Sequence, residues 1–161
     1  MIPTSRHLSY AKGYIELGMV NEASDELEQI DWDDRLKAEV LAVRLDLYLA
    51  TKNWELMVAM ANALAKGNPE QSQWWVQWAY ALREWGKAEE AKEVALKRLE
   101  LHPDEAILHF NLACYLSLLG EFEEAKKHLN RSIRLDKRFQ AASVEDEDLK
   151  GLWDWFGTVA E

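Results

Sequence analysis

Apolar residues recur along this chain at the spacing of one helix face. One such stretch ends before Gly86 and a second follows it. Separations of three or four residues are typical of a helix that buries one side. The pattern therefore predicts two helices joined by a short turn. Their apolar positions are Trp75, Trp78, Ala79 and Leu82 in the first helix, and Ala88, Ala91, Ala95 and Leu99 in the second.

The same arrangement returns at a fixed interval. Gly18, Gly86 and Gly120 lie on one grid of 34 residues, and Lys52 holds the equivalent place in the unit between. A glycine accepts a positive φ at little cost and so ends a helix readily, which makes each grid position a predicted turn. The interval predicts four helical hairpins over residues of about 4–37, 38–71, 72–105 and 106–139.

This unit resembles the tetratricopeptide repeat, whose pattern combines a tryptophan, a Leu-Gly turn, small alanines and a closing proline. The resemblance covers residues 4–137, with Pro69 and Pro103 closing the second and third units. It implies an all-α fold, a right-handed α-solenoid of stacked antiparallel helix pairs, as a single domain over residues 1–161. The chain departs from the pattern at Arg35, Arg44, Met57 and Lys137.

Residues 143–157 are predicted to form a helix that caps the fourth unit. Ser143 and Asp146 resemble a capping-box start. We expect the apolar side of this helix to cover Leu129 and Ile133, because a terminal repeat needs a cap with a polar outer side. That apolar side consists of Leu149, Leu152, Trp153 and Phe156.

Charge and cysteine content narrow the function classes. The chain has 19 Lys and Arg against 29 Asp and Glu, so its net charge of −10 disfavours nucleic acid and anionic membranes as partners. The run 126–138 is locally basic, but acidic stretches flank it. Charged residues interrupt every apolar stretch before it reaches membrane-spanning length. With Cys114 as the one cysteine and no signal-like amino end, we expect a cytoplasmic protein.

The residues that could carry chemistry fall at structural positions of the repeat. His7 and His109 take the core-facing aromatic position, His102 lies near a turn, and no helix holds a pair of histidines at metal-ligating spacing. We therefore expect no enzymatic activity, no metal and no cofactor. Trp54, Trp75 and Trp78 occupy hydrophobic repeat positions and Trp153 belongs to the apolar side of the cap, whereas Trp32, Trp85 and Trp155 have no assigned role.

The resemblance also implies where a ligand would bind, because first helices line the concave surface of tetratricopeptide domains. Gln77 and Asn111 hold equivalent positions on adjacent first helices, where their amides can bond to the backbone of a peptide. The two groove cations, Lys12 and Arg83, lie too far apart to clamp a terminal carboxylate. The predicted peptide-binding groove consists of Gln73, Val76, Gln77, Tyr80, Arg83, Phe110, Asn111 and Cys114.

These observations predict a non-enzymatic interaction scaffold that binds a peptide segment of another protein in its concave groove. Two alternatives stay open. One is a chaperone of the secretion or co-chaperone type. The other is a self-associating structural protein, with the chain as a monomer or weak homodimer.

Overall fold

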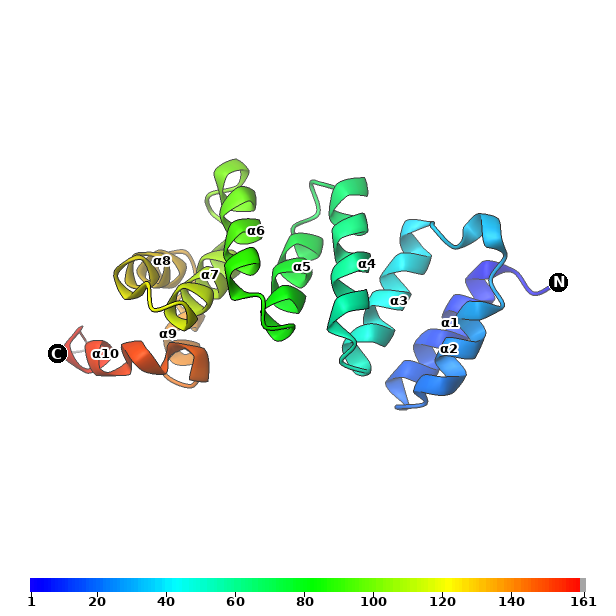
Figure 1. The fold of residues 1–161 in the computed structure, drawn as a ribbon, viewed down its shortest axis with the longest axis horizontal. Helices are drawn as coiled ribbons and strands as arrows, with labels where there is room; N and C mark the ends of the chain where they lie inside the picture. Colours follow the sequence, from blue (N-terminus) through cyan, green and yellow to red (C-terminus); the bar gives the residue numbers. More distant parts are fainter. Residues whose placement is uncertain (160–161) are drawn as a thin grey trace. The chain divides into compact units, whose positions relative to one another are not determined.

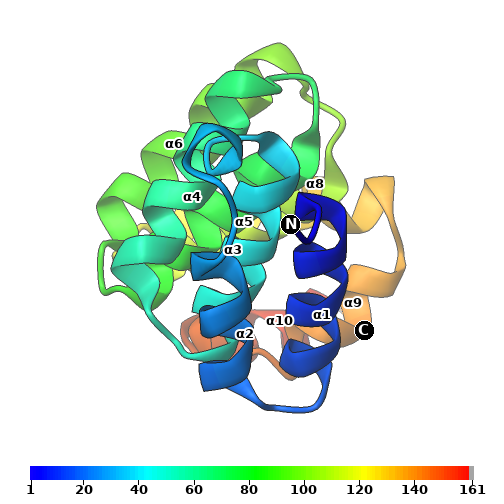
Figure 2. The same cartoon turned by 90° about the vertical axis from the view of Figure 1, so that its right-hand side faces the viewer.

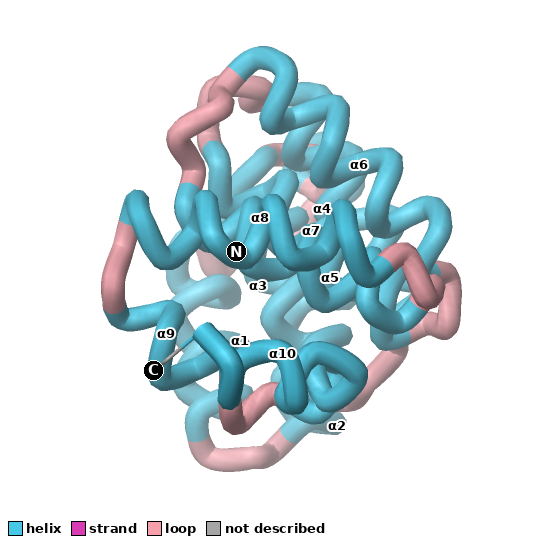
Figure 3. The backbone as a smooth tube through the Cα atoms, turned by 90° about the vertical axis from the view of Figure 1, so that its left-hand side faces the viewer, coloured by secondary structure: helices cyan, strands magenta, loops and turns pink. Residues whose placement is uncertain are grey.

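The structure, a computed structural model, describes residues 1–159, and these residues form helices joined by turns and short loops. No strand occurs in this range, as the colouring of Figure 3 makes clear. In chain order the elements are α1 (Thr4–Glu16), α2 (Val20–Glu28), the 3₁₀ helix η1 (Trp32–Asp34), α3 (Ala38–Ala50), α4 (Trp54–Gly67), α5 (Ser72–Glu84), α6 (Ala88–Leu101), α7 (Ala106–Leu118), α8 (Phe122–Leu135), α9 (Arg138–Ser143), the 3₁₀ helix η2 (Glu147–Leu152) and α10 (Trp153–Val159).

The helices follow the 34-residue interval of the sequence. The four first helices begin at Thr4, Ala38, Ser72 and Ala106, which are the expected starts of the four units. Helix α1 packs on α2, α3 on α4, and α7 on α8. Figures 1 and 2 show the first of these hairpins, with α1 and α2 side by side. The all-α solenoid prediction is therefore confirmed.

A left-handed backbone conformation marks the turn inside each hairpin. The φ angles are 73° at Gly18, 82° at Gly86 and 77° at Gly120, and Lys52 adopts 55° without being a glycine. In the first turn the N–H groups of residues 18 and 19 donate to the carbonyls of Ile15 and Tyr14, at 3.0 and 2.8 Å. These bonds satisfy carbonyls that the helix end would otherwise leave unpaired.

The structure divides into two compact units, residues 1–81 and residues from 82 onward. Small alanines at the predicted helix crossings are fully buried in both units, since larger side chains there would hold the paired helices apart. Met57, a departure from the repeat pattern, is also fully buried and fills core volume between the helices of the second hairpin. The alanines are Ala11, Ala23, Ala79, Ala91, Ala113 and Ala125.

The carboxyl-terminal segment differs from the single helix expected over 143–157. It forms α9, then η2, then α10. Ser143 is the last residue of α9, and its hydroxyl donates to the Gln140 carbonyl at 2.6 Å instead of capping a new helix. Asp146 does cap, because its carboxylate accepts a bond from the Asp148 N–H at 3.0 Å where η2 begins.

Candidate protein-interaction surfaces

The first-helix positions implied to contact a ligand are largely open in the amino-terminal unit. Ser5 and Ser9 of α1 and Glu39 of α3 are exposed, and so is Gln73 at the start of α5. Deeper positions such as Val43 are buried and belong to the core instead. The repeat therefore presents a polar, accessible first-helix surface over α1, α3 and the first part of α5.

A hollow of about 410 Å³ lies between α1 and α3 on this surface. Its lining comes from the last turns of both helices, where the repeat brings three equivalent positions of each together. Asp46 faces Lys12 across the hollow without forming an ion pair. Partial burial raises the pKa of the Asp46 carboxyl, and the Lys12 charge offsets part of that rise. The lining residues are Lys12, Ile15, Glu16, Asp46, Leu49 and Ala50.

Helix α5 carries the first half of the predicted groove. Gln73 and Tyr80 are exposed, while Val76 and Gln77 are half-buried. The Tyr80 ring meets the Trp54 ring edge-on, with 6.1 Å between the ring centres. This contact fixes the direction of the tyrosine and leaves it at the surface, as an anchor for a ligand requires.

The second half of the predicted groove lies under the carboxyl-terminal segment of the same unit. Phe110 is buried and stacks on Phe139 of α9, with ring centres 4.9 Å apart. The Cys114 thiol lies 3.8 Å from the Asp146 carboxylate, and burial together with that charge raises its pKa. The segment after α8 therefore covers the first-helix face of α7, and Asn111 beside it is half-buried.

Arg83 is held by the same segment. Its Nε donates to Asp148 Oδ2 at 2.8 Å, and a second guanidinium nitrogen contacts Asp148 Oδ1. This two-point contact raises the pKa of Arg83. The segment was expected to cover Leu129 and Ile133 of α8. It contacts both α7 and α8, and it also reaches Arg83. No sequence pattern indicates this arrangement, because the two partners are separated by 65 positions and the segment has no repeat.

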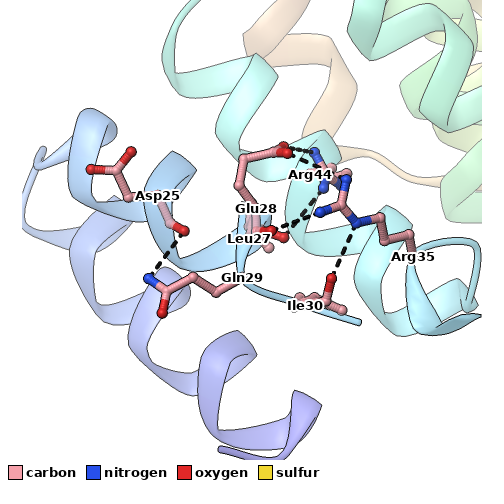
Figure 4. Close-up of polar contacts among 7 residues, drawn as sticks. All are labelled: Asp25, Leu27, Glu28, Gln29, Ile30, Arg35 and Arg44. Carbon is pink, nitrogen blue, oxygen red and sulfur yellow. Dashed lines mark hydrogen bonds and ion pairs between the residues drawn. The ribbon is translucent and has the colours of Figure 1, made fainter. Parts of the chain in front are cut away.

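A second hollow, of about 340 Å³, lies beside the linker between the first two hairpins. Figure 4 shows Arg35 and Arg44 converging on the carboxyl end of α2. Arg35 donates to the carbonyls of Ile30 at 3.1 Å and Glu28 at 2.7 Å, and Arg44 donates to the Leu27 carbonyl at 3.3 Å. Both arginines therefore satisfy the last carbonyls of α2, which explains why they stand where the repeat pattern has other residues.

The rim of this second hollow carries two exposed apolar side chains. Trp32 is 80% exposed and Leu36 is 83% exposed. The Arg35 guanidinium lies 5.3 Å from the centre of the Trp32 ring, so the indole is held in place although it is open to solvent. Leu41, Tyr48 and Met60 complete the apolar wall.

Among residues 1–159, no group of three or more metal-ligating side chains comes together. The structure does join two histidines across α7 and α8, with 2.9 Å between the Nδ1 atoms of His109 and His128. His109 also bonds to the Pro103 carbonyl at 2.7 Å. The pair is part of the hairpin interior. None of the helices in the described range has the length and apolar composition that a membrane span requires.

Comparisons with known proteins agree with this architecture. A family model described as tetratricopeptide repeat matches residues 106–139. The solved structure of MamA MSR-1 is similar with a TM-score of 0.72 and 26% identity, over 82% of this chain and 76% of that chain. That of MamA AMB-1 has a TM-score of 0.71 and 25% identity, over 81% and 72%. No curated protein matches the chain in sequence.

A further MamA structure has a TM-score of 0.71 at 15% identity, over 82% of this chain and 77% of that chain, a likeness of fold alone. The repeats and the fold are those of protein–protein interaction scaffolds. The four helical hairpins on a 34-residue grid share the fold of these structures, and the fourth hairpin matches the tetratricopeptide-repeat model.

Proposed function

We propose that the chain binds a segment of another protein along its first-helix surface and performs no catalysis. The observation that carries this proposal is the contrast between first helices. On α1, α3 and the start of α5 most of the ligand positions are exposed or half-buried, and the last turns of α1 and α3 enclose a hollow. A surface that the chain leaves unfilled is available to a partner.

Under this proposal, the groove residues predicted from the sequence fall into an accessible group and a covered group. Gln73, Val76, Gln77 and Tyr80 on α5 form the accessible part of the site. Their amides and the aromatic ring suit an extended backbone and one apolar side chain. On α7 and at Arg83, a partner would first have to displace the carboxyl-terminal segment, so these positions are proposed to contact a ligand only after that displacement.

Site-specific photo-crosslinking tests the proposal. A photoreactive amino acid replaces Gln73 or Ala50 on the first-helix surface, or Lys97 on α6 as an exposed control. Adducts with one protein of the source cell should form from the first two positions and not from the third. Adducts from Lys97 alone would place the interface on a second helix and refute the groove.

Once that partner is identified, calorimetry measures how much each groove residue contributes. Tyr80→Ala should weaken binding by about 1 to 3 kcal/mol, as the loss of an aromatic anchor does. Asn111→Ala should weaken it by a similar amount only if the carboxyl-terminal segment is displaced. Lys127→Ala on α8 is the control and should leave the affinity unchanged. A loss at Lys127 in place of Tyr80 would contradict the groove assignment.

Self-association is a second candidate function, favoured by the exposed Trp32 and Leu36. The exposed Asp31 and Asp33 lie next to this patch in the sequence, so a two-fold contact through it would bring acidic side chains of both copies to its edge. Sedimentation equilibrium should show a dimer that Trp32→Ala dissociates and Leu101→Ala does not. A monomer at all concentrations would exclude this function.

A further inference from the structure

The hollow between α1 and α3 holds ionisable side chains whose charges do not balance. Glu16 and Asp46 contribute carboxylates and Lys12 contributes one ammonium group. None of the three side chains forms an ion pair or hydrogen bond with another residue of the described range. The hollow therefore carries an excess of one negative charge.

The charges of α8 are arranged differently. On α8, Lys126 and Lys127 each pair with a glutamate three residues earlier, at 2.9 and 2.7 Å. Arg131 of the same helix pairs with Asp104 at 2.6 Å. The basic run of the sequence is thus largely neutralised within its own unit, whereas the carboxylates of the α1–α3 hollow are not.

Apolar side chains line the hollow beside these charged groups. Ile15 and Leu49 are half-buried, and Ala50 also lines the hollow. A lysine or arginine side chain matches such a surface, because its methylene stem packs on apolar groups while its charged end reaches a carboxylate. The positive charge of this side chain would then offset the effect of desolvation, which raises the pKa of Asp46.

We propose that this hollow is the specificity pocket of the first-helix surface and takes a lysine or arginine side chain of the partner segment, with an aliphatic neighbour of that residue on Ile15 and Leu49. This inference rests on the proposed function and names the chemistry of the partner. A basic residue in the segment is selected by charge, and the aliphatic neighbour adds contact area.

Methyl NMR of the full chain tests the inference with three blocked hexapeptides. They repeat Gly-Leu-Lys, Gly-Leu-Glu or Gly-Leu-Gln and are titrated to millimolar concentration. The lysine peptide should shift the methyl signals of Ile15 and Leu49 saturably, with an affinity that falls several-fold at high salt. The glutamate peptide should leave these signals in place, and the glutamine peptide should bind at least about fivefold more weakly than the lysine peptide.

Variants then separate the pocket from non-specific attraction to an acidic protein. Combining Glu16→Gln with Asp46→Asn should weaken the lysine peptide at least about fivefold, because both carboxylates are lost. Glu93→Gln on α6 removes one exposed carboxylate elsewhere and should change nothing. Equal losses in both variants would overturn the pocket.

The remaining outcomes distinguish this inference from the proposed function. Equal binding of all three peptides at Ile15 would overturn the basic preference and leave the groove in place. If no peptide moves these signals, the inference is refuted, and the crosslinking from Gln73 and Ala50 decides the groove separately.

Discussion

Truncation of Trp75 should remove a large part of the stability of this protein. Its side chain is only 8% exposed, packs on Trp78 with ring centres 5.7 Å apart, and donates from Nε1 to the Pro69 carbonyl at 3.0 Å. A buried aromatic ring removes about 150–250 Å² from water, which at about 25 cal/mol per Å² corresponds to roughly 4 to 6 kcal/mol. Aromatic-to-alanine truncations in cores cost about 3 to 5 kcal/mol, so we expect about 4 kcal/mol for Trp75→Ala.

Urea unfolding followed by circular dichroism measures this loss, and two variants divide it into its parts. Trp75→Phe keeps most of the apolar volume and loses the hydrogen bond, so it should cost about 1 to 2 kcal/mol. Trp32→Ala should stay within about 0.5 kcal/mol, because that ring is 80% exposed. Trp78 is only partly buried and should lie between the two, at about 2 kcal/mol.

A cost below about 1 kcal/mol for Trp75→Ala would refute the role of this ring in the core, because that is the scale of surface substitutions. Equal costs for Trp32→Ala and Trp75→Ala would refute it too, because Trp75 is buried and hydrogen-bonded whereas Trp32 is exposed. A loss confined to the hydrogen bond would appear as equal effects of Trp75→Phe and Trp75→Ala.

Local geometry leads to three further predictions. Lys52→Gly should stabilise the chain by about 0.5 to 1 kcal/mol in urea unfolding, since a left-handed lysine is strained, and Gly86→Ala should destabilise it by about 1 to 2 kcal/mol. Burial lowers the pKa of His128, and the neighbouring His109 lowers it further. The unfolded chain therefore takes up a proton on this histidine at a higher pH than the folded chain does. The contribution of neutral His128 to stability is fully present above about pH 6.5 and is lost as the pH falls below that value. His128→Gln should therefore reduce the slope of stability against pH in this acidic range. Asp148→Asn should speed hydrogen exchange across 147–152, because it weakens the contact with Arg83. Ending the chain at Ala142 should lower the melting temperature. Unchanged exchange or an unchanged melting temperature would show that the segment is not held as described.

The sequence by itself determined the helical hairpins and their register. Helix spacing and turn chemistry are local properties, so the sequence alone suffices to place Gly18 and Gly120 in turns. Even Lys52 is assigned to a turn by the interval alone, and it adopts the left-handed conformation that the position requires. The starts of all four first helices follow from the same grid.

The tertiary structure decided which parts of the predicted surface are open. Nothing periodic links Arg83 to Asp148, and a stripe of apolar residues in the carboxyl-terminal segment does not reveal which helix it will meet. Burial of Phe110 therefore could not be predicted from its repeat position. The hollow of the first two hairpins likewise arises where side chains of α1 and α3 meet. Local pattern fixes which face of a helix is apolar, but the path of the chain determines what covers it.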